Sequence, residues 1–183
     1  KEPLAETDVK LIFNEVVRYK ESEYSFLELY KQSKDKNLTA EERAAAKAEL
    51  LDGLERSVQL WDVSNVSLSY QVKNRTAETD ENTSAWIDYN KVEIELSEEG
   101  ELVLEFIHGV AINLSSGSTY QFILEDITDI SNSRNLIKPN PYKVTPFTTV
   151  FAQVNLPSRI SGNTAVTGDP MQWLGDMETE NKA

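Results

Sequence analysis

The most restrictive feature of the sequence is a glycine turn followed by a strand with one apolar face. Leu114, Gly117 and Tyr120 are spaced L-x-x-G-x-x-Y, and the alternation Tyr120, Phe122, Leu124 follows at once. Successive side chains of a β-strand point to opposite faces, so these three alternating residues face one core. A tyrosine that begins such a strand is typical of the tyrosine corner of β-sandwiches, in which its hydroxyl bonds to upstream backbone. The spacing therefore predicts an antiparallel sandwich.

The next stretch of chain carries a resemblance to a known family. Asp129 stands at a polar turn, and Phe147 begins an F-T-T strand. This order resembles the last strands of bacterial Ig-like and fibronectin type III-like modules of cell-surface and phage structural proteins. The family has Gly-Asn in the turn where this chain has Asn132 and Ser133, and asparagine tolerates a left-handed backbone. The resemblance implies an Ig-like sandwich in an extracellular assembly, on a bacterial surface or in a virion.

Charge and composition exclude several classes of partner and site. The net charge of −13 repels phosphate backbones and anionic membranes, so nucleic acid is a poor partner. No apolar run approaches the ~18 residues of a membrane-spanning helix, so no membrane insertion is expected. The chain has no cysteine, which excludes disulfides, thiolate zinc sites and iron–sulfur clusters.

Residues 1–61 show helical periodicity on both sides of a polar break at 33–37. Thr39 begins T-A-E-E, a capping box in which its hydroxyl meets the Glu42 amide and the Glu42 side chain reaches back. The short connection predicts an antiparallel helical hairpin. In its first helix, which we expect to begin at Thr7, the apolar positions are Val9, Ile12, Phe13, Val16, Tyr19, Tyr24, Leu27 and Tyr30.

Two interpretations of the aromatic residues in this hairpin stay open. They form its internal core, or their surplus docks on the sandwich or on another subunit, because two helices alone cannot bury both faces. The residues that would make such a subunit contact are Tyr24, Tyr30 and Trp61.

From residue 62 to residue 154 the apolar period changes from 3.6 to 2. Further strands follow a charged loop, around residues 85–89, 92–96 and 102–107. The first strand of this region is expected to be half-buried, through the alternating Val66, Leu68, Tyr70 and Val72. The predicted fold is therefore α+β: an N-terminal antiparallel helical hairpin followed by an Ig-like antiparallel β-sandwich.

Residues 155–183 lose this periodicity and form the third predicted part, an extended C-terminal arm. We expect an arm of this kind to be held by packing, with Met171, Trp173 and Leu174 as its anchors. The arm either clasps a neighbouring subunit or folds back on its own domain.

Asp126 and Asp129 are the candidate metal ligands, because carboxylate oxygens suit Ca²⁺. Their spacing is not that of an EF-hand loop. The alternative is a structural turn in which Asp129 accepts hydrogen bonds from nearby amides. Apart from this calcium alternative, no cofactor is expected.

The sequence argues against an enzyme. His108 is the single histidine, and nothing near it resembles a nucleophile elbow. The seven glycines are dispersed, so no glycine-rich phosphate loop occurs.

These observations predict a non-enzymatic structural module that contacts protein subunits of the same or a related assembly through the hairpin and the arm. The alternative is a sandwich that binds carbohydrate or cell wall, with Trp86 and Tyr89 as its stacking platform. A third interpretation is an accessory domain of a hydrolase.

Overall fold

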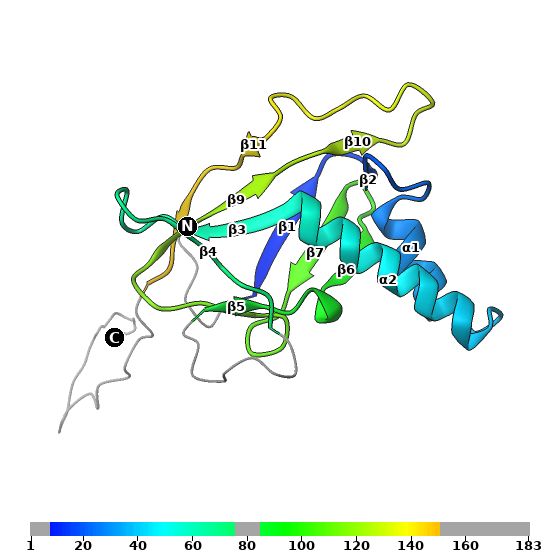
Figure 1. The fold of residues 1–183 in the computed structure, drawn as a ribbon, viewed down its shortest axis with the longest axis horizontal. Helices are drawn as coiled ribbons and strands as arrows, with labels where there is room; N and C mark the ends of the chain where they lie inside the picture. The colour runs from blue at the N-terminus through cyan, green and yellow to red at the C-terminus, as the bar shows by residue number, and fades with distance from the viewer. Residues whose placement is uncertain (1–7, 76–84, 151–183) are drawn as a thin grey trace. The chain divides into compact units, whose positions relative to one another are not determined.

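The computed structural model describes residues 8–75 and 85–150 of the chain (Figure 1). Contacts divide the chain into two compact units, Lys1–Phe151 and Ala152–Ala183, and all the described residues belong to the first. The predicted arm lies outside the described residues, and so do its three anchors, Met171, Trp173 and Leu174. The described part is a mixed α+β fold.

The N-terminal third contains strands as well as helices. The predicted helix from Thr7 is wrong, because the first two elements are β1 (Val9–Phe13) and β2 (Val17–Tyr19). Every second residue of β1 is apolar, so the segment satisfies a strand pattern as well as a helical one. Pairing with a distant strand decides between them. Helices α1 (Phe26–Lys34) and α2 (Ala40–Ser57) follow.

The regular elements of the remaining described chain are short strands and one 3₁₀ helix. Residues 58–61, which the sequence analysis assigned to the helical hairpin, instead belong to strand β3 (Val58–Asp62), which continues directly from α2, so that part of the prediction is wrong. The remaining elements are β4 (Tyr70–Gln71), β5 (Trp86–Ile87), the short 3₁₀ helix η1 (Tyr89–Lys91), β6 (Glu93–Leu96), β7 (Leu102–Phe106), β8 (Ile112–Asn113), β9 (Thr119–Leu124), β10 (Ile127–Asp129), β11 (Tyr142–Lys143) and β12 (Phe147–Thr148).

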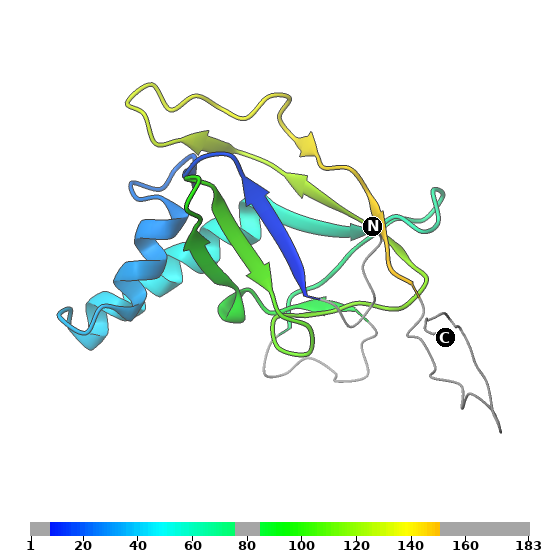
Figure 2. The same ribbon diagram turned by 180° about the vertical axis from the view of Figure 1, so that it is seen from behind.

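The strands pair antiparallel in two larger sheets and two small pairs. One larger sheet has the order β1-β7-β6, and the other has the order β11-β9-β3-β4, with β12 also on β9. The small pairs are β10-β2 and β5-β8. The chain therefore changes sheet from β1 to β3, from β4 to β6 and from β7 to β9. Figure 2 shows the sheet of β1, β7 and β6 from behind.

Both larger sheets and both helices contribute to one hydrophobic core. The rings of Phe106 on β7 and Phe122 on β9 lie 5.6 Å apart and join the two sheets. Tyr120 is completely buried, and Phe122 and Leu124 are buried with it, as the alternation predicts.

Helix α2 has the predicted capping box. The Thr39 hydroxyl accepts from the Glu42 amide at 3.1 Å, and the Glu42 carboxylate accepts from the Thr39 amide at 2.9 Å. Gly53 lets α2 approach its neighbours, because a Cβ there would lie 3.2 Å from Tyr19 Cβ and 3.3 Å from a Phe26 ring carbon. Helices α1 and α2 pack against each other and against β2.

After residue 62, the largest difference between prediction and structure is at the predicted strand 66–72. Only Tyr70 and Gln71 are in strand conformation, as β4. The side chains of Val66, Leu68 and Tyr70 are 94%, 56% and 61% exposed, so they do not form the expected half-buried face. Only Val72 of this alternating set is buried.

Candidate functional site

Arg18 on β2 joins two connections that are far apart in the sequence. Its side chain is only 8% exposed. The guanidinium donates from Nη1 to the Glu23 carbonyl at 3.0 Å, from Nε to the Asp129 carbonyl at 3.1 Å and from Nη2 to the Ser131 carbonyl at 3.1 Å. A planar guanidinium carries five N–H donors in a fixed arrangement, so it can hold several carbonyls at once. Arg18 therefore ties the segment before α1 to the segment after β10.

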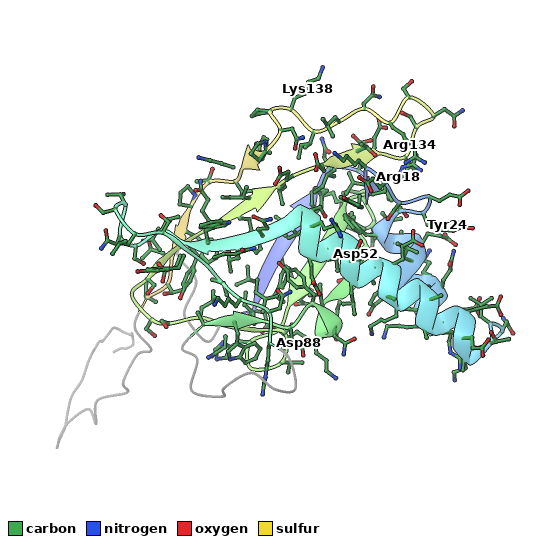
Figure 3. All side chains as sticks on the ribbon, in the orientation of Figure 1. Arg18, Tyr24, Asp52, Asp88, Arg134 and Lys138 are labelled. Carbon is green, nitrogen blue, oxygen red and sulfur yellow. The ribbon has the colours of Figure 1, made fainter. Side chains whose placement is uncertain are left out.

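A second arginine connects the same two segments, but its side chain comes from the segment after β10. Arg134, in the loop between β10 and β11, donates from Nη1 to the Lys20 carbonyl at 3.0 Å and to the Ser22 carbonyl at 3.1 Å. We call Arg18, Arg134 and their five carbonyl acceptors the arginine clasp. Figure 3 shows that the two side chains lie at the same end of the molecule.

Asp129 organises the turn beside the clasp. Its Oδ1 accepts from the Ser131 amide at 3.1 Å, the Ser131 hydroxyl at 2.7 Å and the Asn135 amide at 3.0 Å. Its Oδ2 accepts from the Asn135 side-chain amide at 2.7 Å. These hydrogen bonds, those from Ser131 foremost, lower the pKa of Asp129 to about 2. The local turn considered in the sequence analysis is therefore present.

The Asp129 turn is expected to make stability depend on acidic pH. Its pKa falls from 3.8 to about 2 on folding, so the ionised carboxylate stabilises the fold above about pH 3.8. This contribution is lost as the pH falls through the folded pKa. In urea titrations between pH 4 and pH 2, the wild-type midpoint should fall more steeply than that of Asp129→Asn. Parallel midpoint curves would contradict this role.

Asp126 belongs to the same polar network. Its carboxylate accepts from the Asn140 side-chain amide at 2.9 Å and lies 3.3 Å from Lys20 Nζ. Asn140 and then Lys20 lower the pKa of Asp126. Asp126 and Asp129 thus both interact with donors of their own chain. The described ranges contain no group of three or more histidine, aspartate or glutamate side chains suited to a metal ion.

Exposed apolar side chains lie beside the arginine clasp. Tyr24 follows Glu23, Ile130 precedes Ser131, and the carbonyls of Glu23 and Ser131 bind the same guanidinium. Tyr24 is 44% exposed and Ile130 is 54% exposed. Figure 3 shows Tyr24 at the same end as Arg18 and Arg134. The exposed side chains of Tyr24 and Ile130 are together called the clasp surface below.

Tyr30 and Trp61, the other two residues predicted to make subunit contacts, are half-buried. Tyr30 packs against the core, and Lys34 Nζ lies 4.9 Å from the centre of its ring. Trp61 is on β3, and its indole N–H donates to the Gln59 side chain at 3.2 Å. Of Tyr24, Tyr30 and Trp61, only Tyr24 belongs to the clasp surface.

Trp86 and Tyr89 do not form an exposed stacking platform. Their exposed fractions are 7% and 6%. The Arg75 guanidinium lies 4.3 Å from the centre of the Trp86 ring. The Tyr89 hydroxyl donates to the Val58 carbonyl, and burial raises the pKa of Tyr89 well above its usual range. The rings are therefore parts of the interior.

The arginine clasp is the feature that the sequence analysis missed. Arg18 and Arg134 belong to no motif, and their acceptors include carbonyls more than 100 residues away along the chain. No local pattern of spacing or charge indicates such a connection.

Comparison with protein-family models, curated proteins and solved structures gave no match. Among the helices of the described residues, none has both the length and the apolar character that crossing a membrane requires.

Proposed function

We propose that this chain is a non-enzymatic Ig-like module of an extracellular assembly, on a bacterial surface or in a phage particle. The order of strands supports this assignment. An Ig-like sandwich has a first sheet that includes strands B, E and D, and a second that includes G, F and C. The sheets β1-β7-β6 and β12-β9-β3-β4 follow those orders, if β1 is strand B and β9 is strand F. In that scheme the helical hairpin of α1 and α2 is an insertion between strands B and C.

The observation that carries the assignment is a hydrogen bond at Tyr120. Its hydroxyl accepts from the Ser115 amide at 2.9 Å, five residues upstream, near the start of the strand proposed as F. Gly117 between them has a φ of +76°, the left-handed region that glycine adopts readily. The Tyr120 and Phe147 rings lie 6.0 Å apart, and β12 pairs with β9 at these residues. This is the geometry that a tyrosine corner requires.

The clasp surface is the proposed subunit contact on the described part of the chain. Two arginines hold the backbone beside Tyr24 and Ile130, so little conformational entropy is lost when a partner binds there. Exposed aromatic residues at a preorganised surface are common energetic centres of interfaces. In this proposal Tyr30 packs against the core and Trp61 belongs to β3, so neither makes the contact. The arm makes a second contact through Met171, Trp173 and Leu174.

The proposed contact predicts that Tyr24→Ala weakens self-association. Truncation of a central interface tyrosine costs about 2 kcal/mol or more, which is a loss of roughly thirtyfold in affinity. Sedimentation velocity over a concentration series measures this change. The control is Tyr142→Ala, because Tyr142 on β11 is similarly exposed, at 39%. Equal association constants for the two variants and the wild type would refute a contact at the clasp surface.

A further inference from the structure

Strand β4 ends its sheet, and the chain leading into it is exposed. Residues 64–71 are all exposed, and they include the apolar side chains of Val66, Leu68 and Tyr70. Strand β4 pairs with β3 through Gln71 opposite Trp61 and Tyr70 opposite Asp62. Within residues 8–75 and 85–150, no strand pairs with the other edge of β4. Within these ranges, the backbone groups of β4 that point away from β3 therefore have no strand partner.

This edge lacks the usual protection against pairing. Natural sheets protect exposed edges with charged residues, proline or a bulge. Residues 63–72, V-S-N-V-S-L-S-Y-Q-V, contain no charge and no proline, in a chain of which 27% is charged. The sequence around β4 is therefore suited to pairing with another strand.

The apolar pattern of this segment is complementary to itself. In an antiparallel pair of two copies with the two-fold axis at Ser69, Leu68 lies opposite Tyr70 and Val66 lies opposite Val72. Each apolar side chain then meets an apolar side chain across the pair, which stabilises sheets. The Val72 amide donates to the Leu60 carbonyl at 2.8 Å, so the even-numbered backbone groups face β3. By alternation, those of Ser69 and Gln71 face outward.

The net charge of the chain also favours a contact between two copies at an uncharged segment. Each copy carries a net charge of −13, so two copies repel each other wherever acidic surfaces meet. The absence of charge in residues 63–72 removes like-charge pairs at the point of closest approach. A two-fold contact between identical edges is closed, because the same β4 edge of each copy is used in it.

We propose that residues 66–72 pair antiparallel with the same segment of a second copy and lengthen β4 into a strand shared by two chains. This proposal builds on the assembly role proposed above and names the partner. In the single chain the segment is held in a turn, in which the Leu68 amide donates to the Asn65 carbonyl at 2.9 Å and the Ser67 amide donates to the Asn65 side chain at 2.9 Å. Pairing exchanges these hydrogen bonds for ladder hydrogen bonds between the two chains.

The test uses the absence of cysteine in the chain. Ser69→Cys places one thiol at the proposed two-fold axis and changes the side chain little. The control is Val110→Cys, because Val110, between β7 and β8, is also exposed, at 46%. Under mild oxidation, Ser69→Cys should form a disulfide-linked dimer at least about tenfold faster than the control, because pairing raises the effective thiol concentration.

Adding Leu68→Lys to Ser69→Cys should return the rate to that of the control, because it places a charge at the edge. Equal rates for Ser69→Cys and Val110→Cys overturn the pairing.

The outcome of this cross-linking test can be distinguished from the outcome of the Tyr24→Ala test at the clasp surface. If Tyr24→Ala weakens association while Ser69→Cys cross-links no faster than the control, the assembly role stands and the pairing is wrong. If Ser69→Cys cross-links rapidly while Tyr24→Ala has no effect, the pairing stands and the clasp contact is wrong.

Discussion

Replacing Tyr120 by phenylalanine is expected to lower the free energy of unfolding by about 1–3 kcal/mol, although the aromatic ring is retained. The reason is that the Ser115 amide loses the hydroxyl that accepts its hydrogen bond in the fold. A buried hydrogen bond contributes modestly to the free energy of unfolding. Removing only one of its two partners costs more, because the other partner is left without a hydrogen bond. Tyr120 is completely buried, so water cannot readily take the place of the hydroxyl.

Truncation of the whole ring should have a larger effect. Tyr120→Ala is expected to cost about 3–5 kcal/mol, because it leaves a cavity among the core side chains. Chemical denaturation at equilibrium measures both variants, with Tyr142→Phe as the exposed control. If Tyr120→Phe unfolds at the same denaturant concentration as the wild type, the hydroxyl has no role at the corner, and the Ig-like assignment loses its main support.

Replacing Arg18 by methionine should destabilise the fold by about 2–4 kcal/mol. Methionine preserves much of the apolar stem and removes the guanidinium that binds the Glu23, Asp129 and Ser131 carbonyls. Hydrogen bonds to a charged group each contribute about 1.5–3 kcal/mol, and partial relaxation of the loops reduces the sum. Lysine should not restore stability, because a single ammonium cannot reproduce the planar arrangement of donors.

The matched control for Arg18→Met is Arg56→Met on helix α2. Arg56 pairs with Asp52 at 3.0 Å, but both side chains are about 60% exposed, and exposed pairs contribute about 0–1 kcal/mol. Hydrogen exchange adds a local measurement. The Arg18 variant should lose protection at residues 20–25 and 129–135 before the rest of the fold. Equal stability losses for the two variants would show that the clasp does not hold these connections.

The strand pattern after residue 85 could be predicted largely from the sequence. The expected hairpin at 92–107 appears as β6 and β7, and the expected F-T-T strand appears as β12. Apolar and polar residues alternate in β6, and a clear turn separates it from the largely apolar β7, so local chemistry and tertiary burial agree. The capping box at Thr39 could be predicted for the same reason, because all its donors and acceptors lie within four residues.

The N-terminal strands could not be distinguished from a helix by local pattern. Val9, Ile12, Phe13 and Val16 fit a helical stripe, whereas Val9, Leu11 and Phe13 fit a strand. The decision comes from β7, because Val9 pairs with Phe106 and Phe13 pairs with Leu102. A local sequence pattern cannot show pairing with partners about 90 residues away along the chain. Here the tertiary contact overrides the local preference.

The candidate site was predicted only in part. Tyr24 was expected at an interface, and Asp129 was considered as the centre of a turn. The arginines that bring these two regions together were not anticipated, because their acceptors are backbone carbonyls. Every residue has a carbonyl, so the sequence cannot show which ones a buried arginine will bind.

The central claim, that this chain assembles through contacts between subunits, is tested most directly by its molar mass in solution. Multi-angle light scattering over a concentration series should give a mass above that of a single chain of 20.7 kDa, rising with concentration. The double variant Tyr24→Ala and Leu68→Lys should return the mass toward one chain. A wild-type mass that stays at 20.7 kDa at every concentration would contradict the account.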